Sequence, residues 1–246
     1  MSRERYAVVS CHVERPLDDQ VWARLTALQR SRPGGFRIAA LLRPPHAETG
    51  EDETTWLERA RDAAALGPVG HHTHWTAPDH ARPTGADAGE RVRAEAERIR
   101  ELGLAPTLFC GGGWYTDVEV AEACAELEYV DCTMRARRPP YLAEGERWAS
   151  LDDARVVELP SGRALQAIPT THSLGDLARA LARRRLPELV HVYFHDTDLL
   201  EPRRRGLVRA TLSVLARRAR VTDLDALAAM LLPEAHRVAW ADVERL

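Results

Sequence analysis

The sequence predicts an α/β protein with a mainly parallel sheet, which we interpret as one α/β barrel that need not be complete. An open, doubly wound sheet is the alternative. Two observations favour this class. Short apolar runs typical of strands alternate with amphipathic runs typical of helices along the chain. Clusters of histidine, cysteine and glycine directly follow several of these apolar runs, and functional groups gather at the carboxyl ends of strands in both architectures.

In the first half of the chain, each expected strand is a short apolar run and each expected helix carries apolar residues at helical spacing. The expected strands are residues 6–12, 36–42, 68–73 and 107–109. The expected helices are residues 18–31, 51–66, 86–102 and 117–127. Residues 33–35, Pro-Gly-Gly, end the first helix, because proline and glycine are poor helix formers. Strands and helices therefore alternate, as right-handed crossovers of a parallel sheet require.

The second half continues the alternation after a short strand at residues 129–133. Residues 138–152 are rich in proline, glycine and charge, and we expect a loop there. The strands 156–159 and 164–168 flank a Ser-Gly turn, which predicts a hairpin. The remaining expected elements are a helix at 174–184, a strand at 189–194, a helix at 202–218, a strand at 220–222 and a helix at 224–232.

The length and composition limit the function classes. A chain of 246 residues suits a single α/β domain, so we expect residues 1–246 to form one catalytic domain. The net charge of -3 argues against nucleic acid or an anionic membrane as a partner. The sequence does not indicate an oligomeric state. The opening residues lead into an apolar strand without a signal-peptide core, so we expect a cytoplasmic protein. All 34 basic residues are arginine, which excludes lysine-dependent Schiff-base chemistry.

The four cysteines predict no disulfide or zinc ribbon. No two of them have CxxC spacing, and thiols stay reduced in a cytoplasmic protein. Cys11 and Cys110 lie beside the histidine and glycine motifs, where we expect them to be small buried side chains.

The segment Gly70-His71-His72-Thr73-His74 is the strongest chemical motif. His72 and His74 are two positions apart, so both point to the same side of an extended segment. Two imidazoles on one side suit Zn²⁺ or a similar metal. A third ligand is needed, and Glu14, Asp18 and Asp19 are the oxygen candidates near the end of the first strand.

A second motif follows the apolar strand at residues 189–194. This strand delivers His195 to the loop beyond its end, where an imidazole can act as a general acid or base. Asp196 or Asp198 is placed to orient it. His191 alternates inside the strand, and we expect it to be a buried core residue.

A third motif is the glycine-rich run that follows Cys110. Gly112 and Gly113 let the backbone approach a ligand closely, and their N–H groups could hold an oxyanion. Trp114 and Tyr115 could form a wall on which a sugar ring stacks. His172, which follows the strand at residues 164–168, is a further candidate to face the same site.

The order of the motifs over most of the chain resembles that of the polysaccharide deacetylase family, the nodulation-type carbohydrate esterases. The chain is similar to a divergent member of this family. The opening strand with Cys11-His12-Val13-Glu14, the histidine motif His71-His72-Thr73-His74 and the strand and loop from Thr107 to Trp114 resemble three family motifs in turn. Residues 128–131 stand where the family often has Gly-Tyr and an Asp. The ending Val192-Tyr193-Phe194-His195-Asp196 resembles the last motif most specifically.

The resemblance implies a distorted (β/α) barrel with fewer than eight regular strands. It implies a hydrolase that removes the N-acetyl group from an acetamido sugar or glycosylated metabolite. A divalent metal, zinc first with nickel, cobalt, manganese or iron as alternatives, would activate water and polarise the amide carbonyl. A carboxylate-type base would accept the water proton, and His195 would protonate the departing amine. Small glycosides or other glycoconjugates are the implied partners.

Three positions depart from the family pattern. His12, Val13 and Glu14 stand where the family has adjacent aspartates, so Glu14 is expected as a metal ligand and His12 as the base, with Asp18 or Asp19 as alternative ligands. His74 replaces the second metal histidine, because Thr76 stands at its usual place. No arginine stands in the third motif. A barrel that binds carbohydrate without turnover, or a metal hydrolase for another amide or ester, is the competing interpretation.

Overall fold

The computed structural model describes residues 4–46, 49–77, 79–85 and 87–245. The strands are β1 (Tyr6–Val13), β2 (Ala39–Leu42), β3 (Val69–His71), β4 (Leu108–Phe109), β5 (Val130–Asp131), β6 (Trp148–Ala149), β7 (Arg155–Glu158), β8 (Ala164–Ala167), β9 (His172–Ser173), β10 (Leu189–His195), β11 (Arg220–Val221), β12 (Arg237–Ala239) and β13 (Glu244–Arg245). The helices are α1 (Asp19–Ser31), α2 (Glu53–Leu66), α3 (Ala88–Glu101), α4 (Val118–Glu126), α5 (Leu174–Ala182), α6 (Pro202–Leu215), α7 (Leu224–Leu231) and α8 (Trp240–Val243).

The main sheet follows the order β12-β7-β8-β5-β4-β3-β2-β1-β10-β9, and β11 pairs with the beginning of β1. Every neighbouring pair along this path is parallel except the β7–β8 hairpin. Within the part of the chain that the structure describes, no ladder joins the edge strands β9 and β12. The sheet is therefore a curved, incomplete barrel.

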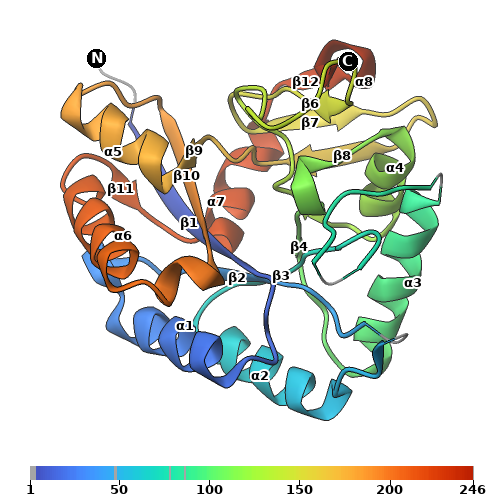
Figure 1. Cartoon of the computed structure of the whole chain (residues 1–246). Coiled ribbons are helices and arrows are strands. Elements are labelled where there is room, and N and C mark those ends of the chain that lie inside the picture. The colour runs from blue at the N-terminus through green and yellow to red at the C-terminus, as the bar shows by residue number, and fades with distance from the viewer. Residues whose placement is uncertain (1–3, 47–48, 78, 86, 246) are drawn as a thin grey trace.

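Alternation along β1 separates the two sides of the sheet. Ala7, Val9, Cys11 and Val13 belong to an outer core that also contains apolar residues of α1, α2, α5 and α6. Val8 lies in an inner core that contains residues of α7. Figure 1 shows α1 to α6 outside the curved sheet and α7 against its inner side. Because side chains alternate with a period of two, His12 faces inward with Val8.

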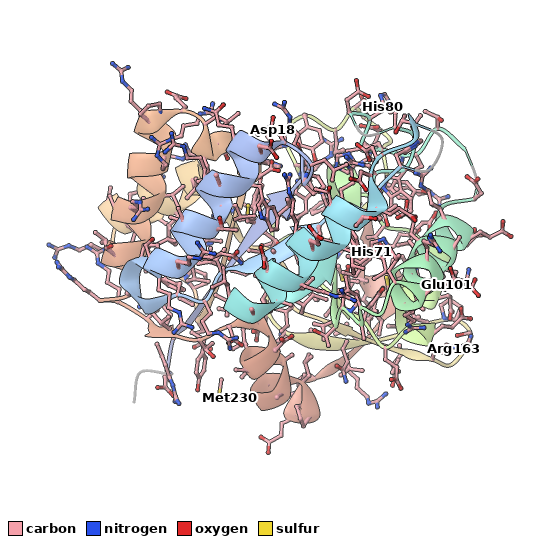
Figure 2. The ribbon with its side chains drawn as sticks, turned by 90° about the horizontal axis from the view of Figure 1, so that it is seen from below. Asp18, His71, His80, Glu101, Arg163 and Met230 are labelled. Atoms are coloured by element: carbon pink, nitrogen blue, oxygen red, sulfur yellow. The ribbon has the colours of Figure 1, made fainter. Side chains whose placement is uncertain are left out.

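The ends of the parallel strands place the polar motifs at one edge. His12 of β1 is paired with His195 of β10, and Leu42 of β2 is paired with His71 of β3, so these four strands end at about the same level. Figure 2 shows Asp18 and His80, from the loops after β1 and β3, at one end of the molecule, with Met230 of α7 at the opposite end. The fold therefore brings together the segments that follow β1, β3, β4 and β10.

The predicted α/β class and the predicted hairpin are confirmed, and the structure differs from the expected elements mainly at their ends. The strand expected at residues 36–42 begins at Ala39, although Phe36 and Ile38 are buried in the outer core. The loop expected at residues 138–152 contains β6, which pairs with the unpredicted β13. The strand β12, which pairs with β7, was not predicted either. None of the described helices is long and apolar enough to cross a lipid bilayer.

Candidate metal centre and adjoining pocket

A cavity of about 410 Å³ opens at the carboxyl end of the sheet. Its lining combines imidazoles, a carboxylate, an arginine and aromatic rings. The lining residues are His12, Glu14, His72, Asp79, His80, Ala81, Arg82, Gly111, Gly113, Trp114, Tyr141, Tyr193 and His195. This volume lies within the usual range of small-molecule sites.

Glu14, His72 and His74 meet beside this cavity. One ligand atom of each lies within 4.8 Å of those of the other two, and Glu14 Oε1 is 3.8 Å from His74 Nε2. His72 and His74 are buried, whereas the Glu14 side chain is 30% exposed toward the cavity. The loops after β1 and β3 therefore bring two imidazoles and one carboxylate to a single point.

The donor chemistry of this cluster fits a divalent metal. His72 Nδ1 donates a hydrogen bond to the Cys110 carbonyl at 2.7 Å, which leaves the lone pair on Nε2. Burial lowers the pKa of His72 well below its ordinary value, so the imidazole stays neutral, as a metal ligand must be. Two histidines and one glutamate form a ligand set found in catalytic zinc sites that leave one position open.

Asp19 does not join this cluster, contrary to the expectation. It begins α1, its side chain is 93% exposed, and its carboxylate pairs with Arg59 of α2. Asp18 caps α1 by accepting hydrogen bonds from the N–H groups of Gln20 and Val21 at 3.0 and 3.1 Å. Both aspartates therefore make contacts at the start of α1. Glu14 is the carboxylate near the end of β1 that lies beside the histidines.

His12 lies on the cavity floor, packed among aromatic and imidazole rings. Its ring centroid is 4.7 Å from that of His72, 5.0 Å from Trp114 and 5.2 Å from Tyr193. Burial, followed by repulsion from His72 and His195, lowers the pKa of His12 well below its ordinary value. A buried imidazole of this kind is neutral but a weak base, which disfavours the role of base expected for it.

His195 stands at the rim of the cavity, with its side chain 36% exposed. Its Nε2 is 3.6 Å from Glu14 Oε1, and its Nδ1 is 4.0 Å from Asp198 Oδ2. The same Asp198 carboxylate accepts the His195 backbone N–H at 3.0 Å and pairs with Arg204. Asp198 therefore fixes the backbone of His195 and places a carboxylate beside Nδ1 of its ring.

Asp196, the other carboxylate considered for orienting His195, has partners in the backbone instead. It is fully buried and accepts hydrogen bonds from the N–H groups of Arg15 and Thr197 at 2.9 and 2.7 Å. Burial raises its pKa to about 6, and the two hydrogen bonds oppose that rise. The side chain holds the loop after β1 against the end of β10, so it supports the backbone next to Glu14.

The glycine-rich run splits into residues that line the cavity and residues that pack behind it. Gly113 and Trp114 line the cavity, and Gly113 has a φ of 59°, a left-handed conformation that favours glycine. A Cβ atom on Gly112 would stand 2.5 Å from the Thr73 carbonyl oxygen, so this glycine allows the two loops to meet. Tyr115 instead donates its hydroxyl hydrogen to Asp117 at 2.6 Å. Oxyanion binding by the Gly113 N–H stays a prediction.

Three further histidines have structural partners. His71 Nε2 is 2.9 Å from Glu95 and 3.0 Å from Thr73 Oγ1. His191 is buried, as expected, with Nε2 2.9 Å from Ser10 Oγ, and burial lowers its pKa to about 4. His172, expected to face the site, is half-buried beside β10, hydrogen-bonded to Thr171 at 2.8 Å, and does not line the cavity.

Sequence reasoning missed several residues of the cavity wall. Tyr193 lies two positions before His195 on β10, so the alternation of this strand could have identified it. Tyr141 and Arg82 come from loops, and Arg82 is held there by a hydrogen bond of 2.7 Å to the Gly113 carbonyl. Arg135 packs behind the wall, with its guanidinium carbon 4.2 Å from the Trp114 ring centroid and 5.0 Å from that of Tyr193. No local motif marks these loop residues.

No protein-family model matches this sequence, and no curated protein matches it. Solved structures do resemble it. One is a 4-alpha-glucanotransferase from Thermococcus litoralis, with a TM-score of 0.59 and 12% identity, covering 97% of this chain and 42% of that chain. Another is a mutant of a CE4 family pseudoenzyme with restored enzymatic activity, with a TM-score of 0.56 and 10% identity, covering 96% of this chain and 70% of that chain.

These similarities show the fold. The chain spans less than half the length of the glucanotransferase and about two thirds of the CE4 family protein. The fold is a distorted, incomplete α/β barrel similar to that of the CE4 family protein, as the order of the motifs indicated. Since one barrel fold serves many reactions, the chemistry has to be argued from the site.

Proposed function

We propose that this protein is a metal-dependent hydrolase that removes the N-acetyl group from an acetamido sugar or a small glycoconjugate. The observation that carries the proposal is the convergence of Glu14, His72 and His74 beside a cavity whose rim bears His195. A metal with three protein ligands at the edge of a cavity is the usual arrangement for hydrolysis by an activated water. We further propose that residues 1–246 act as one catalytic domain.

The metal would be held by Glu14 Oε1 or Oε2, the Nε2 atom of His72 and a ring nitrogen of His74, with zinc as the first candidate. When bound, such a cation polarises the amide carbonyl and favours deprotonation of the attacking water. The protein supplies the remaining groups. Trp114, Tyr141 and Tyr193 offer aromatic faces to a sugar ring, and Arg82 lies at the same wall.

We assign proton transfer to His195. Its imidazole faces the cavity, and Asp198 lies on the opposite side of the ring. In the proposed sequence, His195 accepts a proton from the attacking water as the C–O bond forms. It then donates that proton to the amine nitrogen as the C–N bond breaks, which releases acetate and the free amine. His12 stays neutral on the cavity floor and keeps His72 in place by packing.

Acetate release from a panel of acetamido sugars tests this function. Wild type loaded with zinc should release acetate and expose one amine for each acetate formed. A Glu14→Gln variant should lose most of this activity, since an amide is a poor metal ligand, whereas Asp19→Asn should keep it. Metal-independent activity, or equal activity in Glu14→Gln, would contradict the proposal.

A second candidate is a carbohydrate-binding protein without turnover. It is favoured by one observation: His12, at the position expected for the base, is buried and weakly basic. This candidate predicts that sugars bind in the aromatic pocket with no acetate release at any metal loading. Calorimetric binding combined with the acetate assay separates the two candidates.

A further inference from the structure

Arg135 is a buried cation with unused hydrogen-bond donors beside the pocket. Arg135 is only 7% exposed, and the Nε and Nη1 atoms of its guanidinium are buried without a hydrogen-bond partner. Among the described residues, no carboxylate lies within ion-pair distance of its guanidinium. Every other polar contact described for this residue involves its backbone.

The backbone holds Arg135 in this place. Its N–H donates to the Ala149 carbonyl at 3.0 Å, and its carbonyl accepts the Leu151 N–H at 3.0 Å. Single parallel bridges also join it to Ser150 and Thr170. The backbone of Arg135 is therefore fixed between the segments that carry Ser150 and Thr170.

Two aromatic rings of the pocket wall cover the guanidinium. Its central carbon is 4.2 Å from the centroid of Trp114 and 5.0 Å from that of Tyr193, and both residues line the cavity. Cation–π contacts compensate part of the cost of burial, but they satisfy no N–H group. A buried arginine is normally paired with an anion, which its planar fork binds through two hydrogen bonds.

We propose that Arg135 receives an anionic group of the ligand, a phosphate or a carboxylate carried by the sugar, at the end of the pocket formed by Trp114 and Tyr193. The identity of the sugar in this inference rests on the proposed function, whereas the presence of an anionic group on it rests on Arg135 alone. Arg135 does not itself line the cavity, so the anion meets it at the edge of the Trp114 and Tyr193 rings, which do. The substrate is then an acidic acetamido sugar whose ring contacts these aromatic side chains and whose charge meets Arg135.

The test compares neutral and anionic probes by isothermal titration calorimetry. The probes are N-acetylglucosamine, its 1-phosphate, its 6-phosphate, N-acetylmuramic acid and inorganic phosphate. The proteins are wild type, Arg135→Met, which keeps an unbranched side chain over the rings without the charge, and the control Arg137→Met, which removes an exposed arginine two positions away. The phosphate and carboxylate arms distinguish the two sources of the anion.

We expect at least one anionic sugar to bind about ten to a hundred times more tightly than N-acetylglucosamine, as charge-assisted hydrogen bonds would provide. Arg135→Met should abolish this preference, and Arg137→Met should keep it. The Tm of Arg135→Met should stay the same or rise, because the variant removes a buried charge without an acidic partner.

Three results would overturn the inference. The first is that wild type shows no preference for any anionic probe, including inorganic phosphate. The second is that Arg135→Met keeps the same preference as wild type. The third is that Arg135→Met has a lowered Tm and loses affinity equally for neutral and anionic sugars, which identifies a structural role. Acetate release is scored separately. Deacetylation of neutral sugars without anion preference refutes only this inference, whereas Arg135-dependent anion binding without acetate release refutes only the proposed function.

Discussion

At the scale of single residues, His195 has the clearest chemical assignment. It is the histidine of the cavity that combines exposure with an acidic neighbour on each side, Glu14 and Asp198. His195→Ala should reduce kcat for acetate release about 10²- to 10⁴-fold, the usual contribution of general acid–base catalysis. Stability should change little, since the side chain is partly exposed.

The matched control is His172→Ala, which removes a half-buried imidazole that does not line the cavity. Steady-state kinetics of both variants at one metal loading check this prediction. Comparable losses of kcat in the two variants would contradict the assignment of His195.

The residues that could be predicted from sequence are those whose position follows from local geometry. The alternation within an extended segment placed His72 and His74 together, and the strand end placed His195 at the rim. The choice among Glu14, Asp18 and Asp19 could not be made, because it depends on where β1 ends and α1 begins. Arg135 had no local signal at all, since its partners come from β10 and the glycine-rich loop.

At the scale of elements, the start of α1 separates a capping residue from a metal ligand. Asp18 accepts two backbone N–H groups of the first turn, so Asp18→Ala should lower the free energy of unfolding by about 1 kcal/mol. Asp18→Asn should be nearly neutral, because asparagine is an equally good cap. Denaturant unfolding measures the loss, and metal binding should be unchanged in both variants. Loss of metal binding in Asp18→Ala would indicate that Asp18 is a metal ligand and not only a helix cap.

The end of β5 carries a buried carboxylate that makes stability depend on pH. Burial raises the pKa of Asp131 from the ordinary 3.8 to about 6, although Thr133 N–H donates to it at 3.0 Å. Its Oδ2 is buried without a hydrogen-bond partner. Because the folded state holds this proton more tightly than the unfolded chain, its stabilising effect is present below about pH 4 and is lost as pH rises through about 6.

Asp131→Asn should therefore gain stability relative to wild type between pH 4 and pH 7. The full change corresponds to about 3 kcal/mol, since one pKa unit is worth about 1.4 kcal/mol. Urea unfolding at several pH values measures this difference, with Asp152→Asn as an exposed control. A difference between wild type and Asp131→Asn that does not vary with pH would contradict the burial argument.

Element boundaries were predictable where capping or periodicity is local. Helices α1 and α2 begin next to Asp18 and Asp52, whose side chains cap them. The strands β6, β12 and β13 were not predictable, because each is two or three residues long and exists through its pairing with a distant segment. Short strands carry too few residues for a periodic signal.

At the scale of the whole molecule, the barrel can be inferred from the order of the motifs, but its closure cannot. Whether the edge strands β9 and β12 join depends on pairing between segments far apart in the sequence, and no ladder joins them among the described residues. A metal that links the loops after β1 and β3 should stabilise the folded chain, because it binds the folded state better than the unfolded state.

Zinc at a hundred times its Kd should raise the free energy of unfolding by about 2.7 kcal/mol. Thermal unfolding with and without zinc checks this, with calcium as the control cation, because calcium prefers oxygen ligands. An equal rise in Tm with calcium, or in a His72→Ala variant, would show that the effect does not come from this cluster.

Equilibrium dialysis against zinc, with the metal measured by elemental mass spectrometry, tests whether Glu14, His72 and His74 form one metal site. The proteins are wild type, a His72→Ala/His74→Ala double variant and Asp19→Ala. We predict about one zinc ion per chain in wild type and Asp19→Ala, and loss of tight binding in the double variant. No bound metal in wild type, or equal metal in the double variant, would show that these three residues do not form a metal site.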